Sequence, residues 1–522
     1  MKQFFTLFKG ACLATVALLT VACSGGADYR SALPADAFMT LSFNPAALSE
    51  KSNAGAFADS ELFARINEEL AGVESLSAEQ KEYYLSLLKN PAETGVDMDR
   101  DSYMFFTLEG ENPAQPTGRG GLLLPLADRA KFDAFIAQVN AVSGLEVEQS
   151  GTISYVRVGE QSDVSVVCAF NEAACMLFVS QENPEECLSR VKDLFAQKTD
   201  KSLIGNRAIA ERLAGKNDIN VVLSYAALMP MLKSNPMVAA MPAMEALGGV
   251  SLLGSMNFEK GRIVVDGAMA FADDAAKAKL EELYGYVEPQ TGKLLRYLPA
   301  QSIAAMGMGL NGGKLFTMLS SMPGYGMLMA NPMVMEAFDG DLLLGFSGML
   351  PGGQYPVASL LAQVKDAGVM QLLVSNFGGM PLVETAKDQY SISMGGVSAF
   401  FGVKDNVLYI TSDAAVKTAL DGSQIESFES HKELFKDQAS SFFVDFRGVV
   451  ALVGQLTAGV GATDEARMAL EVLGLFDRME LSGTTEGGRM VVYMTNGERN
   501  ALETICAETG RLIEANLPEA NN

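Results

Sequence analysis

The sequence contains no tryptophan and a single histidine, His431, among its 522 residues. One histidine cannot supply a cluster of imidazole ligands, and a Ser-His or Cys-His catalytic pair would have to use that residue. His431 lies in the charged segment 429–433, a pattern typical of a solvent-exposed helix. We therefore expect His431 to face solvent, and we expect no metal or other cofactor.

Basic residues are also scarce. The chain has 39 Lys and Arg against 63 Asp and Glu, which gives a net charge of −24. Such a surface repels phosphate backbones, so nucleic acid is excluded as an expected partner. Beyond residue 23 there is no apolar run of the roughly 20 residues that a membrane-spanning helix needs. A membrane could then be reached only through an anchor.

The first residues predict such an anchor. Lys2 and Lys9 form a short basic region before an apolar run over 11–22, and Cys23 follows the run. This order is that of a secretory signal peptide over 1–22. The segment 19–23 resembles a lipobox, in which the cysteine is acylated and becomes the mature N-terminus, although Thr20 replaces the usual branched residue. Cys23 is thus predicted to carry acyl chains such as palmitate at the start of a lipidated tether, 23–30. An ordinary signal peptide is the alternative.

Segments of the mature chain recur in the same order. The Leu-Pro-Ala sequence at 33–35 recurs at 298–300, and the strand entered at 259–265 recurs at 486–492. A hairpin pattern over 164–179 and the Leu122-Leu123 pair also recur, at 397–411 and 360–361. The offset falls steadily from 265 to 227 residues, as loop deletions in a second copy would produce. We predict two tandem, diverged domains, 31–288 and 289–522.

Both predicted copies mix helix and strand patterns. Apolar residues at i, i+3, i+4 and i+7 predict core-facing helices over 132–139 and 370–377, with Asp128 and Asp366 as N-caps. Runs of strands joined by short turns predict a mainly antiparallel sheet. The expected fold class is α+β, present twice, with helices packed on one face of each sheet.

Two cysteines, Cys168 and Cys175, are predicted to face each other across a hairpin turn at 171–172. An exported protein can form disulfides, so this pair could be bridged. The matching positions of the second copy hold apolar residues, and free cysteine often fills such positions. The sequence leaves both possibilities open.

The 28 methionines are clustered, and they are the candidates for a binding surface. Three interpretations compete: packing in cores, an adaptable apolar surface for a lipid or partner, and thioether coordination of Cu(I). Neighbours such as those at 306 and 308 simply share one face of a strand, so no metal site is predicted. The candidate apolar binding residues are Met229, Met231, Met237, Met241, Met306, Met308, Met327, Met329 and Met333.

The lipobox, the opening Leu-Pro-Ala strand, the Thr-Gly-Val-Asp segment at 94–97 and the closing Gly-Arg-apolar hairpin occur together. In this combination the chain resembles, over nearly all of its mature length, a family of uncharacterised lipoproteins from Bacteroidales. That family is described mainly as a domain of unknown function. The resemblance implies anchoring in the cell envelope and supplies no catalytic residues.

The expected function is non-enzymatic. We expect an outer-membrane-anchored lipoprotein, on the periplasmic side or the cell surface, that binds or assembles an apolar ligand or an envelope protein in a cleft lined by methionines. A purely structural envelope component is the alternative. A third hypothesis is a hydrolase using the carboxylates Asp97, Asp99 or Asp101, since paired acids alone can perform acid–base chemistry.

Overall fold

The computed structural model describes residues 28–55, 61–73, 76–109, 117–158, 164–239, 241–320, 332–350, 353, 355–376, 382–394, 397–457 and 463–516. Cys23, Met327 and Met329 lie outside the described residues. The chain divides into two compact units. Unit 1 comprises the residues up to Pro236, Gly248–Lys260 and the residues from Glu498, and unit 2 comprises Met237–Leu247 and Gly261–Gly497.

Unit 1 contains nine strands within its described residues: β1 (Ala37–Phe43), β2 (Ser102–Glu109), β3 (Thr117–Pro125), β4 (Glu148–Ser150), β5 (Ile153–Val158), β6 (Ser165–Phe170), β7 (Ala174–Ser180), β8 (Ile219–Ser224) and β9 (Val250–Glu259). Its helices are α2 (Pro45–Ser52), α3 (Glu61–Ala71), α4 (Ala78–Lys89), α5 (Arg129–Ser143), α6 (Pro184–Ala196), α7 (Arg207–Leu213), α8 (Tyr225–Lys233) and α19 (Ala501–Asn516). Short 3-10 turns are η1 (Tyr29–Ala32), η3 (Pro91–Thr94), η4 (Thr199–Lys201) and η5 (Leu203–Gly205).

The strands of unit 2 are β10 (Arg262–Phe271), β11 (Val287–Glu288), β12 (Ala304–Asn311), β13 (Phe338–Met349), β14 (Pro356–Val364), β15 (Val383–Ala386), β16 (Gln389–Met394), β17 (Val397–Lys404), β18 (Val407–Thr411), β19 (Ser440–Asp445), β20 (Phe476–Gly483) and β21 (Gly487–Met494). Its helices are α10 (Pro242–Leu247), α11 (Asp274–Leu283), α12 (Gly312–Ser320), α13 (Pro332–Glu336), α14 (Gly368–Asn376), α15 (Ala414–Leu420), α16 (Lys432–Phe435), α17 (Phe446–Thr457) and α18 (Asp464–Leu473). The 3-10 turns are η6 (Lys293–Tyr297) and η7 (Phe428–His431), and α9 (Pro236–Ala239) begins at the last residue of a unit 1 segment.

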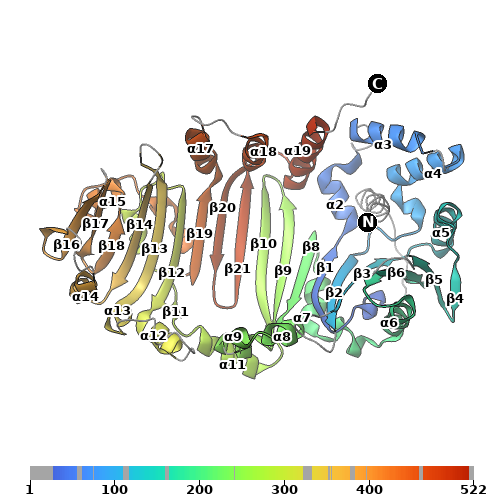
Figure 1. Cartoon of the computed structure of the whole chain (residues 1–522), viewed down its shortest axis with the longest axis horizontal. Helices are drawn as coiled ribbons and strands as arrows, with labels where there is room; N and C mark the ends of the chain where they lie inside the picture. Colours follow the sequence, from blue (N-terminus) through green and yellow to red (C-terminus); the bar gives the residue numbers. More distant parts are fainter. Residues whose placement is uncertain are drawn as a thin grey trace. The chain divides into compact units, whose positions relative to one another are not determined.

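Strand pairing is antiparallel throughout the described part of both units. In unit 1 the order is β9–β8–β1–β2–β3–β7–β6–β5–β4. In unit 2 it is β10–β21–β20–β19–β12–β13–β14–β18–β17–β16–β15, and β11 extends the β19 side of β12. Figure 1 shows β19, β12, β13 and β14 side by side. The predicted combination of helices with antiparallel sheet is confirmed.

The compact units do not follow the predicted boundary at residue 288. Strand β10, which falls in the first predicted copy, pairs with β21 inside unit 2. Helix α19, from the second predicted copy, packs on α2 inside unit 1. The physical reason is that the strand ladder and the helix contact join segments far apart in sequence. A boundary between repeated sequences therefore need not be a boundary between compact bodies.

Local signals account for several element boundaries. Asp128 caps α5 by accepting a hydrogen bond from the backbone N–H of Lys131, and Asp366 accepts one from Gly368 N at the start of α14. The β17–β18 hairpin turns through Asp405 and Asn406, both with left-handed φ values of 51° and 59°. Asp and Asn tolerate this conformation better than most residues, as two-residue hairpin turns require. The predicted caps and this hairpin are confirmed.

The sheet of unit 2 carries apolar side chains on both faces. One cluster contains Leu361 and Tyr409 together with residues from η6, α15, η7 and α16. A second cluster contains Ala362 and Leu408 together with residues from α13 and α14. Successive residues of a strand point to opposite faces, so these clusters lie on opposite sides of one sheet. The prediction that helices cover only one face is wrong for unit 2.

None of the described helices is long and apolar enough to pass through a lipid bilayer.

The prediction that His431 faces solvent is wrong. Its ring stacks on Phe428, with 4.2 Å between the ring centroids, and meets Phe443 edge-on at 4.5 Å. Burial against these rings lowers the pKa of the imidazole below its ordinary value. The charged neighbours made the segment look solvated, but the 3-10 turn η7 aims this one side chain at the core.

We predict that replacing His431 with Phe removes part of the pH dependence of stability. A lowered pKa in the folded state means that the unfolded chain binds the proton more readily, so stability falls as the pH drops through the ordinary imidazole pKa of 6.5. Phenylalanine keeps the stacking and does not titrate. Urea midpoints compared at neutral pH and about two pH units lower should fall less for His431→Phe than for the natural chain. Parallel pH profiles for the two proteins would contradict the assignment.

Candidate functional site

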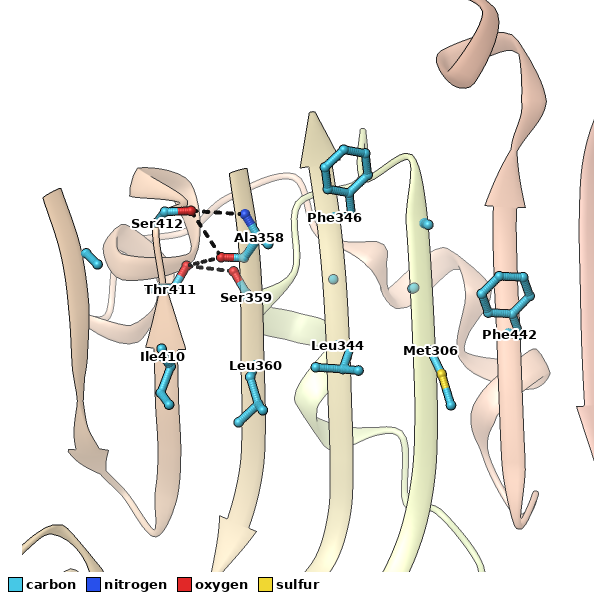
Figure 2. Close-up of a pocket in the computed structure, with 14 residues that line it drawn as sticks. Met306, Leu344, Phe346, Ala358, Ser359, Leu360, Ile410, Thr411, Ser412 and Phe442 are labelled. Carbon is cyan, nitrogen blue, oxygen red and sulfur yellow. Dashed lines mark hydrogen bonds between the residues drawn. The ribbon is translucent and has the colours of Figure 1, made fainter. Parts of the chain in front are cut away.

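A groove of about 430 Å³ lies on one face of the unit 2 sheet. It crosses the strands β18, β14, β13, β12 and β19, and Figure 2 shows its side chains on neighbouring strands. Protein pockets that bind small molecules usually have volumes of ~300–1,000 Å³. The groove is lined by Ala304, Ala305, Met306, Leu344, Gly345, Phe346, Ala358, Ser359, Leu360, Ala399, Ile410, Thr411, Ser412 and Phe442.

Five of these side chains form one row across the strands, which we call the unit 2 row. Met306 pairs with Leu344 on one side and with Phe442 on the other. Leu344 pairs with Leu360, and Leu360 pairs with Ile410. Residues directly opposite in antiparallel strands have side chains on the same face, close enough to touch. The row therefore forms a continuous apolar strip.

The row is open to solvent. Met306 keeps 46% of its surface exposed, Leu344 keeps 40% and Ile410 keeps 45%. Contiguous apolar side chains left in water are unfavourable for an isolated molecule, and such patches often mark sites of interaction.

The residues between those of the row form the core on the other face. Ala305, Leu343, Leu361, Tyr409 and Phe443 alternate with the row and belong to one buried cluster. Burial raises the pKa of Tyr409 to about 12. Adjacent residues of one strand thus serve a sealed core and an open groove.

The few polar atoms of the groove are occupied internally. Ser359 Oγ and Thr411 Oγ1 lie 2.6 Å apart, and Ser412 Oγ donates to the carbonyl of Pro356 at 2.8 Å. The Ala358 N–H donates to Ser412 Oγ at 3.1 Å, as Figure 2 shows. None of the lining residues carries a charge. Contact with apolar groups is therefore the chemistry that this groove offers.

The structure separates the methionines that the sequence grouped. Met306 lines the groove, whereas Met308 is half-buried farther along β12. Met229 is buried in α8 and Met231 is half-buried in the same helix, both in unit 1. The other described candidates are exposed on unit 2 and do not line the groove: Met237, Met241 and Met333. Of the described candidates, only Met306 belongs to this site.

A second pocket, of about 660 Å³ and polar, lies in unit 1. Two of the candidate carboxylates, Asp99 and Asp101, line it, whereas Asp97 is buried and is not among the lining residues. Burial raises the pKa of Asp101, whose carboxylate accepts a hydrogen bond from Asn44 Nδ2 at 3.0 Å. Of the three carboxylates named as alternatives for a hydrolase, two therefore line one pocket and the third does not.

Three other charged residues that line this pocket form ion pairs. Arg30 Nη2 lies 2.8 Å from Asp28, and Lys51 Nζ lies 2.7 Å from Asp218. The guanidinium of Arg100 stacks on a tyrosine ring of η1 at 4.2 Å. Such ion pairs and cation–π contacts stabilise the start of the described chain.

The described cysteines are free thiols. The sulfur atoms of Cys168 and Cys175 lie 3.7 Å apart, and Cys175 is buried in an apolar cluster that Cys168 borders. Cys187 is also buried, and the burial of Cys175 agrees with the second possibility, a free cysteine that fills an apolar position. Within the part of the chain that the structure describes, no group of three His, Cys, Asp or Glu side chains could hold a metal ion.

Comparison with known proteins places the chain in a family. The family model described as a domain of unknown function (DUF4836) matches residues 29–478, and the chain belongs to this family. Membership of a family of unknown function was expected from the sequence; the link to lipoproteins of Bacteroidales stays a prediction. No curated protein matches the chain.

Two crystal structures of TP0453 show weak similarity. Crystal form I is 11% identical, with a TM-score of 0.25, and the match covers 50% of this chain and 87% of that one. Crystal form III is 10% identical, with a TM-score of 0.22, and covers 76% of this chain and 100% of that one. Scores this low carry no argument about fold or function.

Sequence reasoning missed most of the groove. A usable signal was present in the strands, where apolar residues stand next to each other at 342–344, 360–361 and 442–443. A strand with only one apolar face alternates with polar residues, whereas adjacent apolar residues place apolar surface on both faces. The signal does not tell which strands lie side by side.

We predict that two neighbouring leucines of β13 differ in their contribution to stability. Leu343 is 3% exposed and belongs to the core, so Leu343→Ala should cost about 2–5 kcal/mol of unfolding free energy. Leu344→Ala, at the neighbouring residue on the groove face, should lower the unfolding free energy by less than about 1 kcal/mol. Urea denaturation of both variants measures the difference. Equal losses would contradict the assignment of the open face.

Proposed function

We propose that unit 2 binds the acyl chain of a lipid along the unit 2 row. The observation that carries this proposal is the continuous, uncharged strip from Ile410 to Phe442, in which three side chains are exposed and two are half-buried, on a sheet whose other face is already filled. The protein would then be a non-enzymatic binding protein. Burying this strip under a ligand removes apolar surface from water, which favours binding by about 25 cal/mol per Å².

The backbone around the row favours an alkyl chain over an extended peptide. Strands β12, β13, β14 and β18 each have a hydrogen-bonded neighbour on both sides. They therefore offer no free edge to which another strand could add. A peptide lying across the row would bring N–H and C=O groups into a strip without partners for them, which costs free energy. An alkyl chain brings none.

The cellular setting is also proposed. The signal peptide and the lipobox at Cys23 support an outer-membrane-anchored lipoprotein, in which a lipid-binding unit would lie beside its ligand's source. The strand succession β19–β12–β13–β14–β18–β17–β16–β15 of unit 2 has the same form as β8–β1–β2–β3–β7–β6–β5–β4 of unit 1. This agreement supports descent of the two from one duplicated domain.

We predict that a charge in the unit 2 row weakens binding there. Met306→Glu should weaken binding of the uncharged fluorescent probe N-phenyl-1-naphthylamine at the unit 2 row by tenfold or more, because a carboxylate would lie in an apolar contact. The full chain carrying Cys23→Ser, which cannot be acylated there, is titrated with the probe and then with monooleoylglycerol as competitor. The competitor should displace the probe.

Val383→Glu is the matched control, because Val383 is an exposed apolar residue of unit 2 that does not line the groove. The Val383→Glu variant should bind the probe with the same affinity as the chain that keeps Val383. Equal affinities and equal amounts of bound probe for Met306→Glu and the control would exclude the groove as a binding site. Probe binding that monooleoylglycerol cannot displace, together with recovery of a protein on cross-linking through the row, would replace the lipid with a protein partner.

We also predict that Cys23 is acylated. Cells that make the protein and are fed radioactive palmitate should label the natural chain, and Cys23→Ser should remove the label because the lipobox then has no thiol to be acylated. The single change Cys506→Ser, at an exposed cysteine of α19, should leave labelling intact. Labelling that survives Cys23→Ser would contradict the lipobox assignment.

A further inference from the structure

Unit 1 has a second row of apolar residues on equivalent strands, which we call the unit 1 row. Leu41 of β1 pairs with Met104 of β2 on one side and with Val221 of β8 on the other. Met104 pairs with Leu122 of β3, and Leu122 pairs with Leu177 of β7. The five side chains share one face of the sheet, as cross-strand pairs do.

The unit 1 row is accessible. Met104 keeps 38% of its surface exposed, and the other four residues are half-buried rather than sealed. No residue of the row is charged or polar. The strip therefore has the same chemical character as the one in unit 2.

The opposite face of the unit 1 sheet is already filled. Phe105, Leu123 and Phe178 alternate with residues of the row along their strands and have exposures of 0–1%. Residues of η1, α6, η5 and α7 are buried as well. The core on that face therefore does not use the side chains of the unit 1 row.

One end of each open face is closed in the same way. In unit 1 a cluster of α5 residues, including Phe132, packs with Cys175 of β7. In unit 2 a cluster of α14 residues, including Met370, packs with Leu408 of β18. Cys175 stands two residues before Leu177, as Leu408 stands two residues before Ile410. Each row therefore begins one side-chain pair beyond the part of the face that a helix covers.

We infer that unit 1 carries a second binding strip for a lipid acyl chain, so that the protein binds two chains, one on each unit. This inference rests on the function proposed for unit 2. Strands β1, β2 and β3 each have hydrogen-bonded neighbours on both sides, so the same argument against an added peptide strand applies. An uncharged row with no free backbone group selects an alkyl chain by contact alone.

The absence of tryptophan from the chain gives a direct test. Met104→Trp and Met306→Trp each place a single tryptophan in one row, and a monoacylglycerol with a brominated acyl chain quenches tryptophan that it touches. The full chain carrying Cys23→Ser is used in both cases. Quenching of both reporters at saturation, with two ligands bound per chain, is the expected result. Val142→Trp, an exposed position of α5 outside the row, should not be quenched.

The outcomes separate the two proposals. Quenching at Met306→Trp alone, with one ligand per chain, overturns the unit 1 strip and leaves the unit 2 site standing. Quenching at Met104→Trp alone supports the unit 1 strip and removes the unit 2 site. Absence of quenching at both removes both proposals. Met104→Glu in the natural background is the second measurement, and it should lower the number of bound ligands from two to one with an unchanged circular dichroism spectrum.

Discussion

A β-strand presents its side chains alternately to the two faces of its sheet, and this single constraint governs the molecule. Wherever the chain places two apolar residues next to each other in a strand, it puts apolar surface on both faces. Helices and 3-10 turns pack on one face of the unit 2 sheet, and in each unit a helix packs against one end of the other face. The open strips are the part of that second face that stays accessible among the described residues.

The contrast between the two pockets follows from this arrangement. In the polar pocket of unit 1, several charged groups of the lining already form ion pairs, such as Asp218 with Lys51. The groove of unit 2 contains apolar side chains that stay exposed to water in the described structure, as at Met306 and Ile410. Recognition at the groove therefore draws on unused contact surface, and recognition at the polar pocket would first have to break existing interactions.

Local chemistry was predictable from the sequence, and contacts between distant segments were not. The cap at Asp128 and the turn through Asp405 and Asn406 depend on a few neighbouring residues, and the sequence places them correctly. The groove depends on the pairing of β12 with both β13 and β19. The residues of β12 and β19 lie more than one hundred positions apart in the sequence. His431 shows the same limit, because its ring is placed by Phe428 and Phe443 and not by its charged neighbours. Clustering of methionines in the sequence likewise does not tell which of them meet.

Unit 1 is assembled from segments taken from both ends of the chain. Asn500 Nδ2 donates to the carbonyl of Phe258 at 3.0 Å, and α19 packs on α2. These contacts belong to the first unit, yet residues 498–516 are synthesised after all of unit 2. A ribosome or an export channel that releases the chain from its N-terminus therefore delivers unit 1 incomplete and supplies its last helix at the end. A chain truncated before residue 498 would therefore contain all of unit 2 and lack part of unit 1.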